Sequence, residues 1–417
     1  MTATPVDKER LHGLDAVRAF ALLLGIWLHA SMSFWAPPGV WATQDRSTGT
    51  AAYILGFHYI HMFRLAAFFF MAGFFGRLVY HRRGLRGFLR DRCKRILVPL
   101  VCGWMVVYPL IVLVWIWGAV RAGAVLAPGS EKLPVWQVWI GAFATGDVFR
   151  DGIRPAHLWF LYCLLQMYAL VLVARPLLRP LRSTADRVMR VVMGNPAGPV
   201  LLAVPIAAAL YWLRDPGGVR TPDLNLRPDP LVLLAYGTPF AFGWLLQRQP
   251  ELLGRLARRW WAYLAVGMAA GTIPLVITLR MTAAGNPALP APAVLPFAAT
   301  YALGMVFLSL GFTGTFLRWL SRPVPAIRYL SDAAYWLYIA HLPLVAALQV
   351  ASSRWALHWS LKWAMILAVA LTVLLLSYQN MVRYSFIGRV LNGPRQRGQL
   401  LRETVPLPEC AAPATRV

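Results

Sequence analysis

The stretch that decides the fold is residues 96–118, ILVPLVCGWMVVYPLIVLVWIWG, in which no side chain is charged. A helix needs about 20 apolar residues to cross the ~30 Å hydrocarbon core of a bilayer. This run is long enough to do so. It follows directly on residues 77–95, the most basic stretch of the chain, which carries eight Arg and Lys side chains. Basic residues collect on the cytoplasmic side of membrane proteins. We therefore predict a transmembrane helix that starts in the cytoplasm.

Similar apolar runs recur along the whole chain. The sequence is 59% hydrophobic, with a mean hydropathy of +0.55, whereas soluble domains are about 45–50% apolar. The sequence therefore predicts an all-α, polytopic membrane bundle of about ten transmembrane helices, of which the fifth is the shortest. Besides residues 96–118, the runs lie at roughly 14–36, 53–79, 157–178, 199–213, 230–247, 260–280, 292–313, 326–352 and 361–382.

Three segments follow from these runs. The transmembrane domain is predicted at 11–385, after a short tail at 1–10 and before a polar tail at 386–417 that we expect to be cytoplasmic and disordered. The first run carries Asp15 and Arg18 and is longer than the apolar part of a signal peptide, so we expect it to remain as the first helix.

The net charge of +25 alone would suggest nucleic-acid binding. The basic residues, however, lie between the apolar runs. With the N-terminus inside, 28 of the 41 Arg and Lys residues lie in cytoplasmic segments and 11 lie outside. The positive-inside rule thus predicts that both termini are cytoplasmic and disfavours nucleic acid as a partner.

The first helix carries three ionisable side chains, Asp15, Arg18 and His29. Arg18 and His29 are eleven residues apart, which in an α-helix is about 20° of rotation and roughly 16 Å of rise. They therefore share one face, with Arg18 near the cytoplasm. Asp15 is placed to pair with Arg18. Such residues in hydrocarbon indicate function, although an ion pair at a helix end and a packed core histidine would look the same.

Four more histidines fall at a similar depth, in the outer half of the bundle. His58 and His61 lie three residues apart near the start of the second helix, His157 opens the fourth, and His341 lies within the ninth. A metal site is one interpretation. No carboxylate or cysteine ligand accompanies the set, so general-base chemistry by a neutral imidazole is favoured.

A different chemistry is indicated at the cytoplasmic side. Arg92 and Arg95, one turn apart at a helix start, are candidate phosphate ligands, because the guanidinium fork fits phosphate oxygens. Topology and anionic lipid would also explain much of this basic stretch. Trp159 and Tyr335 are expected to pack and orient rather than react.

Several motifs occur in a recognisable order. They are Gly13-Leu14-Asp15-Ala16-Val17-Arg18 with His29, His61-Met62 ahead of Phe68-Phe69-Phe70-Met71-Ala72-Gly73-Phe74, Arg92-Cys93-Lys94-Arg95, His157-Leu158-Trp159-Phe160-Leu161, and Ser331-Asp332-Ala333-Ala334-Tyr335-Trp336-Leu337-Tyr338 with His341-Leu342-Pro343. In this order the chain resembles the acyltransferase-3 family of bacterial membrane acyltransferases. The later motifs also look similar to the glucan biosynthesis protein C subgroup of succinyltransferases. Two departures are Arg64, where proline is common, and Ala72, where serine is usual.

The resemblance implies an O-acyltransferase of the bacterial inner membrane. It would move an acetyl or succinyl group from cytoplasmic acyl-CoA to a hydroxyl of an envelope glycan outside, with no permanently bound cofactor. His29 is the expected general base, and His61 would orient the acceptor or complete the site. The other positions expected to bind donor or acceptor are Asp15, Arg18, His58, Arg92, Arg95, His157, Trp159, Tyr335 and His341.

Two other classes remain open at this point. In a transporter or flippase for a glycan or lipid, the same polar residues would line a path, and in a scaffold they would only pack. The sequence shows no two-fold hydropathy repeat of the kind that many transporters carry, which favours the enzyme.

Overall fold

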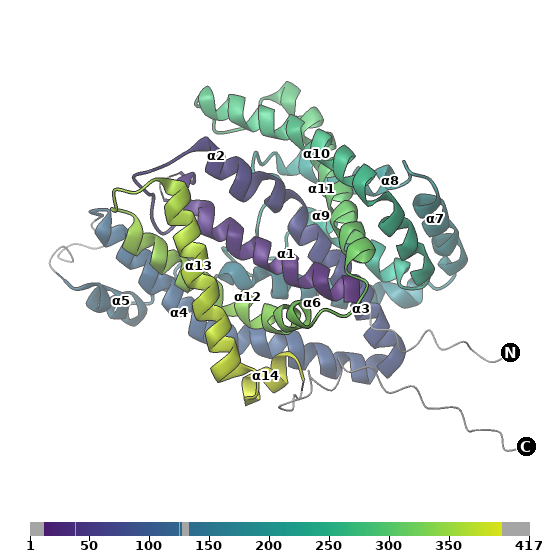
Figure 1. Cartoon of the computed structure of the whole chain (residues 1–417), viewed down its shortest axis with the longest axis horizontal. Coiled ribbons are helices and arrows are strands. Elements are labelled where there is room, and N and C mark those ends of the chain that lie inside the picture. The colour runs from purple at the N-terminus through teal and green to yellow at the C-terminus, as the bar shows by residue number, and fades with distance from the viewer. Residues whose placement is uncertain (1–11, 38, 125, 127–132, 394–417) are drawn as a thin grey trace, which may run out of the picture.

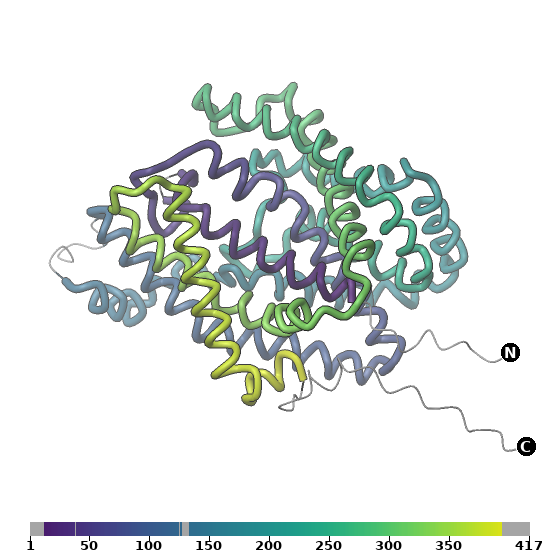
Figure 2. Tube along the Cα trace, viewed as in Figure 1, coloured from purple at the N-terminus to yellow at the C-terminus, as the bar shows by residue number. Residues whose placement is uncertain are grey.

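The computed structural model describes residues 12–393 except 38, 125 and 127–132. Within this part of the chain all regular structure is helical, and the helices form one bundle (Figures 1 and 2). The predicted fold class is confirmed. Each of the ten predicted runs coincides with a helix or with part of one: α1 His12–Ser31, α3 Tyr59–Arg92, α4 Val98–Arg121, α6 Trp159–Leu177, α8 Val200–Leu213, α9 Pro230–Leu246, α10 Leu253–Ala283, α11 Ala291–Trp319, α12 Pro325–Ser352 and α13 Trp359–Ser377.

By length and hydropathy, seven described helical segments are able to cross a membrane. One of them, Thr50–Arg121, is 72 residues long and contains both the second and the third predicted run. The fifth and sixth runs, α8 and α9, are shorter apolar helices of 14 and 17 residues. The remaining helices are short: α2 Thr50–Tyr53, α5 Val135–Ala144, α7 Arg182–Gly194 and α14 Phe386–Leu391.

The basic stretch at 77–95, expected to be a loop, is instead helical and continues α3 almost to α4. Its one break is at Gly84, whose φ of 64° and ψ of −175° suit only glycine. A turn of π-helix, Cys93–Leu97, then leads into α4. The chain reverses at this glycine and is helical on both sides of it, so the arginines of the stretch at 77–95 lie on helices.

Helix α1 lies in the middle of the bundle and contacts α3, α11, α12 and α13 (Figure 1). Its buried side chains include Leu14, Val17 and Ile26. Helices α3 and α9 approach closely, because a methyl group built on Gly73 would lie 2.0 Å from the Phe240 carbonyl oxygen. This agrees with the expected use of small residues for close helix packing.

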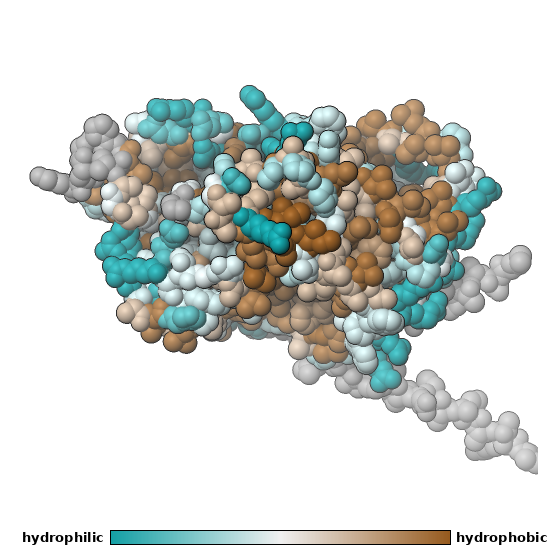
Figure 3. Space-filling view, turned by 90° about the horizontal axis from the view of Figure 1, so that it is seen from above, coloured by the Kyte–Doolittle hydropathy of each residue, from teal (hydrophilic) through white to brown (hydrophobic). Residues whose placement is uncertain are grey.

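The outer surface carries large apolar side chains, which a soluble protein would bury. Leu201, Val204 and Trp212 of α8 are at least 59% exposed, and Met105 and Val106 of α4 are 64% exposed. Figure 3 shows apolar side chains gathered across the middle of one face, with hydrophilic ones toward its edges. This pattern is typical of contact with lipid, so the chain is a multi-pass membrane protein.

The first and last described helices meet at the same end of the bundle. Arg18 of α1 donates to Ser331 of α12 at 2.8 Å, and Asn392, just after α14, donates to the carbonyl of Asp332 at 2.6 Å. An even number of crossings would place them so. Helix α14 also corrects the predicted tail: its first residues are helical, and only 394–417 lie outside the described residues.

Candidate active site

A cavity of about 1430 Å³ runs along one face of α1. Asp15, Arg18, Leu22, Gly25 and His29 all line it, spaced three or four residues apart as one helical face requires. From Asp15 to His29 the helix rises about 21 Å. The prediction that Arg18 and His29 share a face is therefore confirmed, and one continuous space connects them.

His29 is hydrogen-bonded to His341 of α12, with 2.8 Å between His29 Nδ1 and His341 Nε2. The other ring nitrogen of His341, Nδ1, lies 2.8 Å and 3.1 Å from the carbonyl oxygens of Tyr338 and Leu337. Carbonyls only accept, so this nitrogen must carry the N–H. In a neutral ring Nε2 is then an acceptor, and His29 Nδ1 must donate to it.

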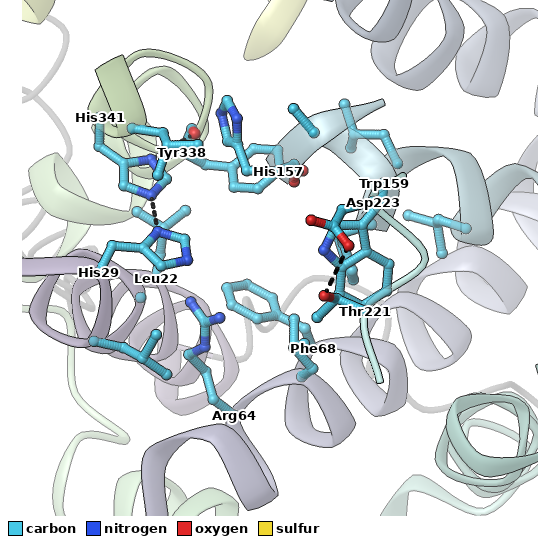
Figure 4. Close-up of a pocket in the computed structure, with 18 of the residues that line it drawn as sticks. Leu22, His29, Arg64, Phe68, His157, Trp159, Thr221, Asp223, Tyr338 and His341 are labelled. Atoms are coloured by element: carbon cyan, nitrogen blue, oxygen red, sulfur yellow. Dashed lines mark hydrogen bonds between the residues drawn. The ribbon is translucent and has the colours of Figure 1, made fainter. Parts of the chain in front are cut away.

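This chain of hydrogen bonds leaves His29 Nε2 without a proton. No described residue is hydrogen-bonded to that nitrogen, and Figure 4 shows it facing the space between the labelled side chains. Gln349 fixes the backbone nearby, donating to the carbonyl of His29 at 3.0 Å, and Trp41 donates to the Gln349 amide at 2.8 Å. A held imidazole with a free lone pair in a cavity is equipped to act as a general base.

The cavity brings together four of the five predicted histidines. His61 and His157 line it with His29 and His341. His157 donates through Nε2 to the Ile339 carbonyl at 3.0 Å, and its Nδ1 has no described partner. The His61 ring stacks on Phe57, with 4.5 Å between the ring centres.

His58 is not among the residues that line the cavity. Its Nε2 lies 2.9 Å from the Gly271 carbonyl of α10, so this imidazole ties two helices together. Residues three apart on a helix differ by about 60° in direction, which is enough to turn His58 away while His61 faces inward.

Arg64 also lines the cavity, one turn after His61 on α3. In the sequence Arg64 stands out only as a departure from a family pattern, although a charge within a transmembrane helix is itself a signal of function. Figure 4 shows its guanidinium pointing into the same space as His29. Tyr338 of α12 faces that space as well.

Three arginines line the end of the cavity near the cytoplasmic end of α1, and they differ in how far their guanidinium groups are engaged by other side chains. Arg92 is bonded to Asp91 at 2.6 Å and to the Tyr168 hydroxyl at 3.0 Å, so its guanidinium is already engaged. Arg95 is 3.4 Å from Asp91 and 41% exposed. The Arg18 side chain is 43% exposed, 3.8 Å from Asp15, as the sequence predicted.

Aromatic side chains support both ends of the cavity. The Tyr335 hydroxyl donates to the Arg95 carbonyl at 2.5 Å, which holds the start of α4 against α12. Trp159 is buried and lines the cavity opposite His29 (Figure 4). Both side chains thus lie at the cavity, and their expected roles in packing and orientation stay a prediction.

The far end of the cavity is built by two loops. Asp147 and Arg154 come from the segment before α6, and Thr221 and Asp223 come from the loop before α9. The Thr221 hydroxyl donates to Asp223 at 3.2 Å, and burial raises the pKa of the Asp223 carboxyl. Nothing in the sequence marks the second loop, because its place depends on the packing of α6 against α9.

The described residues contain no group of three or more His, Cys, Asp or Glu side chains that could hold a metal ion. His29 and His341 are hydrogen-bonded to each other, His157 is hydrogen-bonded to a backbone carbonyl, and the His61 ring stacks on Phe57.

Fold and cavity together define an integral membrane protein with a histidine-lined cavity inside its helix bundle. A family model described as "Acyltransferase domain" matches residues 11–378. The chain therefore belongs to the acyltransferase-3 family, as its motifs indicated.

Relatives with curated names match over a shorter stretch. The protein "Glucans biosynthesis protein C" of Escherichia coli strain SMS-3-5 / SECEC is 31% identical over 105 residues, which cover 23% of this chain and 24% of that protein. Its counterparts in strains O1:K1 / APEC and O157:H7 are 30% identical over the same shares. The match thus spans about a quarter of the length of these relatives. No solved structure matches.

Proposed function

We propose that the protein transfers an acyl group from acyl-CoA, bound from the cytoplasm, directly to a hydroxyl of an envelope glycan that enters from the other side. The enzyme would lie in the bacterial inner membrane, with the Arg18 end of the bundle in the cytoplasm. The acyl group would be acetyl or succinyl. The positive-inside charge distribution supports this orientation, and the names of the curated relatives support a glucan as the acceptor.

The single observation that carries the proposal is the cavity along α1. It begins among exposed guanidinium groups at Arg18 and Arg95, which suit the phosphates of CoA. It passes the free Nε2 of His29 and ends among polar loop residues such as Thr221 and Asp223. A donor and an acceptor entering from opposite ends would meet at His29.

The chemistry needs no covalent intermediate. As the acceptor oxygen attacks the thioester carbonyl carbon, His29 Nε2 takes the hydroxyl proton. The imidazolium keeps its hydrogen bond to His341, whose own N–H is held by backbone carbonyls. When the tetrahedral intermediate collapses, the C–S bond breaks and the proton passes to the CoA sulfur. The products are an ester and free CoA thiol.

The serine nearest to His29 in the sequence does not act as a nucleophile in this scheme. Ser31 lies two residues past His29, and its hydroxyl donates to the Leu28 carbonyl at 2.7 Å rather than facing the cavity. A ternary complex of enzyme, donor and acceptor is therefore the mechanism that the geometry supports best.

The test is acyl transfer by purified protein in detergent. Radiolabelled acetyl-CoA or succinyl-CoA is supplied with a glucan acceptor, and label is followed into the glucan. Replacing a general base costs about 10²–10⁴ in rate, so we expect that loss in His29→Ala. The matched control is His81→Ala, an exposed histidine outside the cavity. Unchanged transfer by His29→Ala would overturn the assignment of the base.

A transporter is the second candidate, because a glycan or lipid could also pass through the same cavity. Sealed proteoliposomes separate the two functions. Labelled glycan that crosses the membrane without gaining an acyl group would support transport, whereas acylation that needs donor and acceptor on opposite sides would support the enzyme.

A further inference from the structure

Arg64 carries a charge into the middle of the bundle without a carboxylate to balance it. No described acidic residue forms an ion pair with Arg64, and its Nε has no hydrogen-bond partner. The groups that act electrostatically on its guanidinium are the hydroxyls of Tyr236 and Tyr338. An arginine remains charged in proteins, and an unbalanced charge away from water is costly. A negative charge supplied by the reaction would offset this cost.

The position of the guanidinium relative to His29 identifies that charge. A methyl group built on Gly25 would lie only 1.9 Å from Arg64 Nη1, so the guanidinium rests directly on the backbone of α1 at Gly25. Gly25 is four residues before His29, about 6 Å along the helix toward the Arg18 end. Arg64 is also close enough to act electrostatically on His29. The guanidinium therefore lies just on the donor side of the base.

We propose that Arg64 is a catalytic residue that binds the carbonyl oxygen of the acyl thioester and stabilises the oxyanion formed when the acceptor attacks. The inference rests on the proposed acyl transfer and goes beyond it by assigning the oxyanion site. The arginine donates hydrogen bonds only and gives up no proton.

The step balances as follows in atoms and charges. The new C–O bond forms as the carbonyl π electrons move onto the carbonyl oxygen, which becomes negative beside the Arg64 guanidinium. The acceptor proton moves to His29 Nε2. When the carbonyl re-forms, its electron pair expels the CoA sulfur, which takes the proton from His29. A fixed cation held beside the developing negative charge stabilises it.

The first experiment compares Arg64→Met and Arg64→Lys with the wild type. Loss of one oxyanion donor costs about 10²–10³ in kcat. We expect that loss for Arg64→Met, with KM for acyl-CoA changed less than about threefold, and a smaller loss for Arg64→Lys, which keeps the charge but not the fork. Thermal unfolding in detergent shows whether each variant is folded.

Two donors distinguish an oxyanion site from recognition of the acyl chain. An oxyanion forms with every thioester, so kcat should fall equally with acetyl-CoA and succinyl-CoA. A loss confined to succinyl-CoA would mean that Arg64 binds the distal carboxylate, and a loss confined to KM would mean ground-state binding only. Either result overturns the proposal.

Gly25→Ala tests position without removing the charge. The methyl group would meet only the flexible end of Arg64, so the fold should tolerate it while the guanidinium shifts. We expect an intermediate loss of kcat, and no further loss when Gly25→Ala is added to Arg64→Met. Additive losses in the double variant would contradict the proposed contact.

Slow hydrolysis of acyl-CoA, with water as the acceptor, is a second readout for the Arg64 variants. It distinguishes a failure of the oxyanion assignment from a failure of the proposed function. If the wild type hydrolyses acyl-CoA but acylates no glucan, the assigned acceptor fails, and the Arg64 comparison still applies to hydrolysis. If the wild type transfers acyl groups and Arg64→Met does so at the same rate, only the oxyanion assignment fails.

Discussion

Two cations within the bundle have opposite surroundings. Lys362 of α13 is fully buried, and its ammonium lies 2.7 Å from Asp45, whose side chain is 1% exposed. Arg64 of α3 faces the cavity, with no carboxylate partner among the described residues. The first charge is compensated inside the protein and fixes the loop before α2 to α13. The second is left for a substrate to compensate, which marks it as functional.

The largest expected effect comes from breaking the compensated pair. Lys362→Met leaves the Asp45 carboxylate buried alone, and removal of one partner of a buried pair typically costs about 3–5 kcal/mol. Thermal or denaturant unfolding in detergent measures this change. The double variant Asp45→Asn/Lys362→Met should recover most of the lost stability. If the single variant is as stable as the wild type, the pair does not hold the loop.

The next effect concerns the hydrogen bond that leaves His29 with a free nitrogen. His341→Phe removes the acceptor for His29 Nδ1, so the imidazole is no longer held in the reactive tautomer. We expect acyl transfer to fall by about 10²–10³. His341→Gln offers an amide oxygen as acceptor and should restore part of the rate. Equal activity of the two variants would show that His341 acts only through packing.

A smaller effect, of opposite sign, is expected for the stability of Arg64→Met. Replacing an uncompensated, partly buried charge with an apolar side chain of similar length should leave the melting temperature unchanged or raise it. The same substitution in a structural role would lower it. A marked fall in melting temperature would place Arg64 in the same class as Lys362 and remove the contrast between them.

The smallest effect lies outside the membrane-spanning segments. Asp186 of α7 accepts two hydrogen bonds from Arg248, at 2.5 and 2.6 Å, and this guanidinium lowers the pKa of the carboxyl below its usual value. A depressed pKa contributes stability above the ordinary pKa of aspartate, and that stability is lost as pH falls through the lowered value.

The pair is partly exposed, so its contribution is small. Asp186→Asn should cost at most about 1 kcal/mol at neutral pH. The difference from the wild type should vanish in acid, where both side chains are neutral. Unfolding followed from pH 7 to a pH below the lowered pKa of Asp186 measures it, and a difference that persists there would mean that packing rather than charge is involved.

Much of this structure follows from local sequence, and the part that does not depends on distant contacts. Each apolar run became a helix, because a bilayer leaves a spanning segment little alternative. The shared face of Arg18 and His29 followed from helical geometry alone. The pairing of His29 with His341 joins residues 312 apart in the sequence, so no local pattern could indicate it.

Two further differences between prediction and structure lie in the basic stretch at 77–95. The basic stretch at 77–95 needs no loop, because a single glycine at positive φ, Gly84, is enough to reverse the chain between two helical segments. Arg92 was expected to be free for phosphate, yet its neighbour Asp91 and the distant Tyr168 engage it. A carboxylate inside a basic stretch was the available signal.

The length of the cavity has a consequence for the cell as well as for catalysis. A cavity that follows α1 from one end of the bundle toward the other would threaten the ion gradients of an energised membrane if water and ions filled it. A fixed positive charge midway along such a cavity raises the energy of any proton or metal cation that enters. Arg64 is positioned to provide that electrostatic barrier. The residue that we propose stabilises the oxyanion would therefore also hinder cations from leaking through the membrane between turnovers.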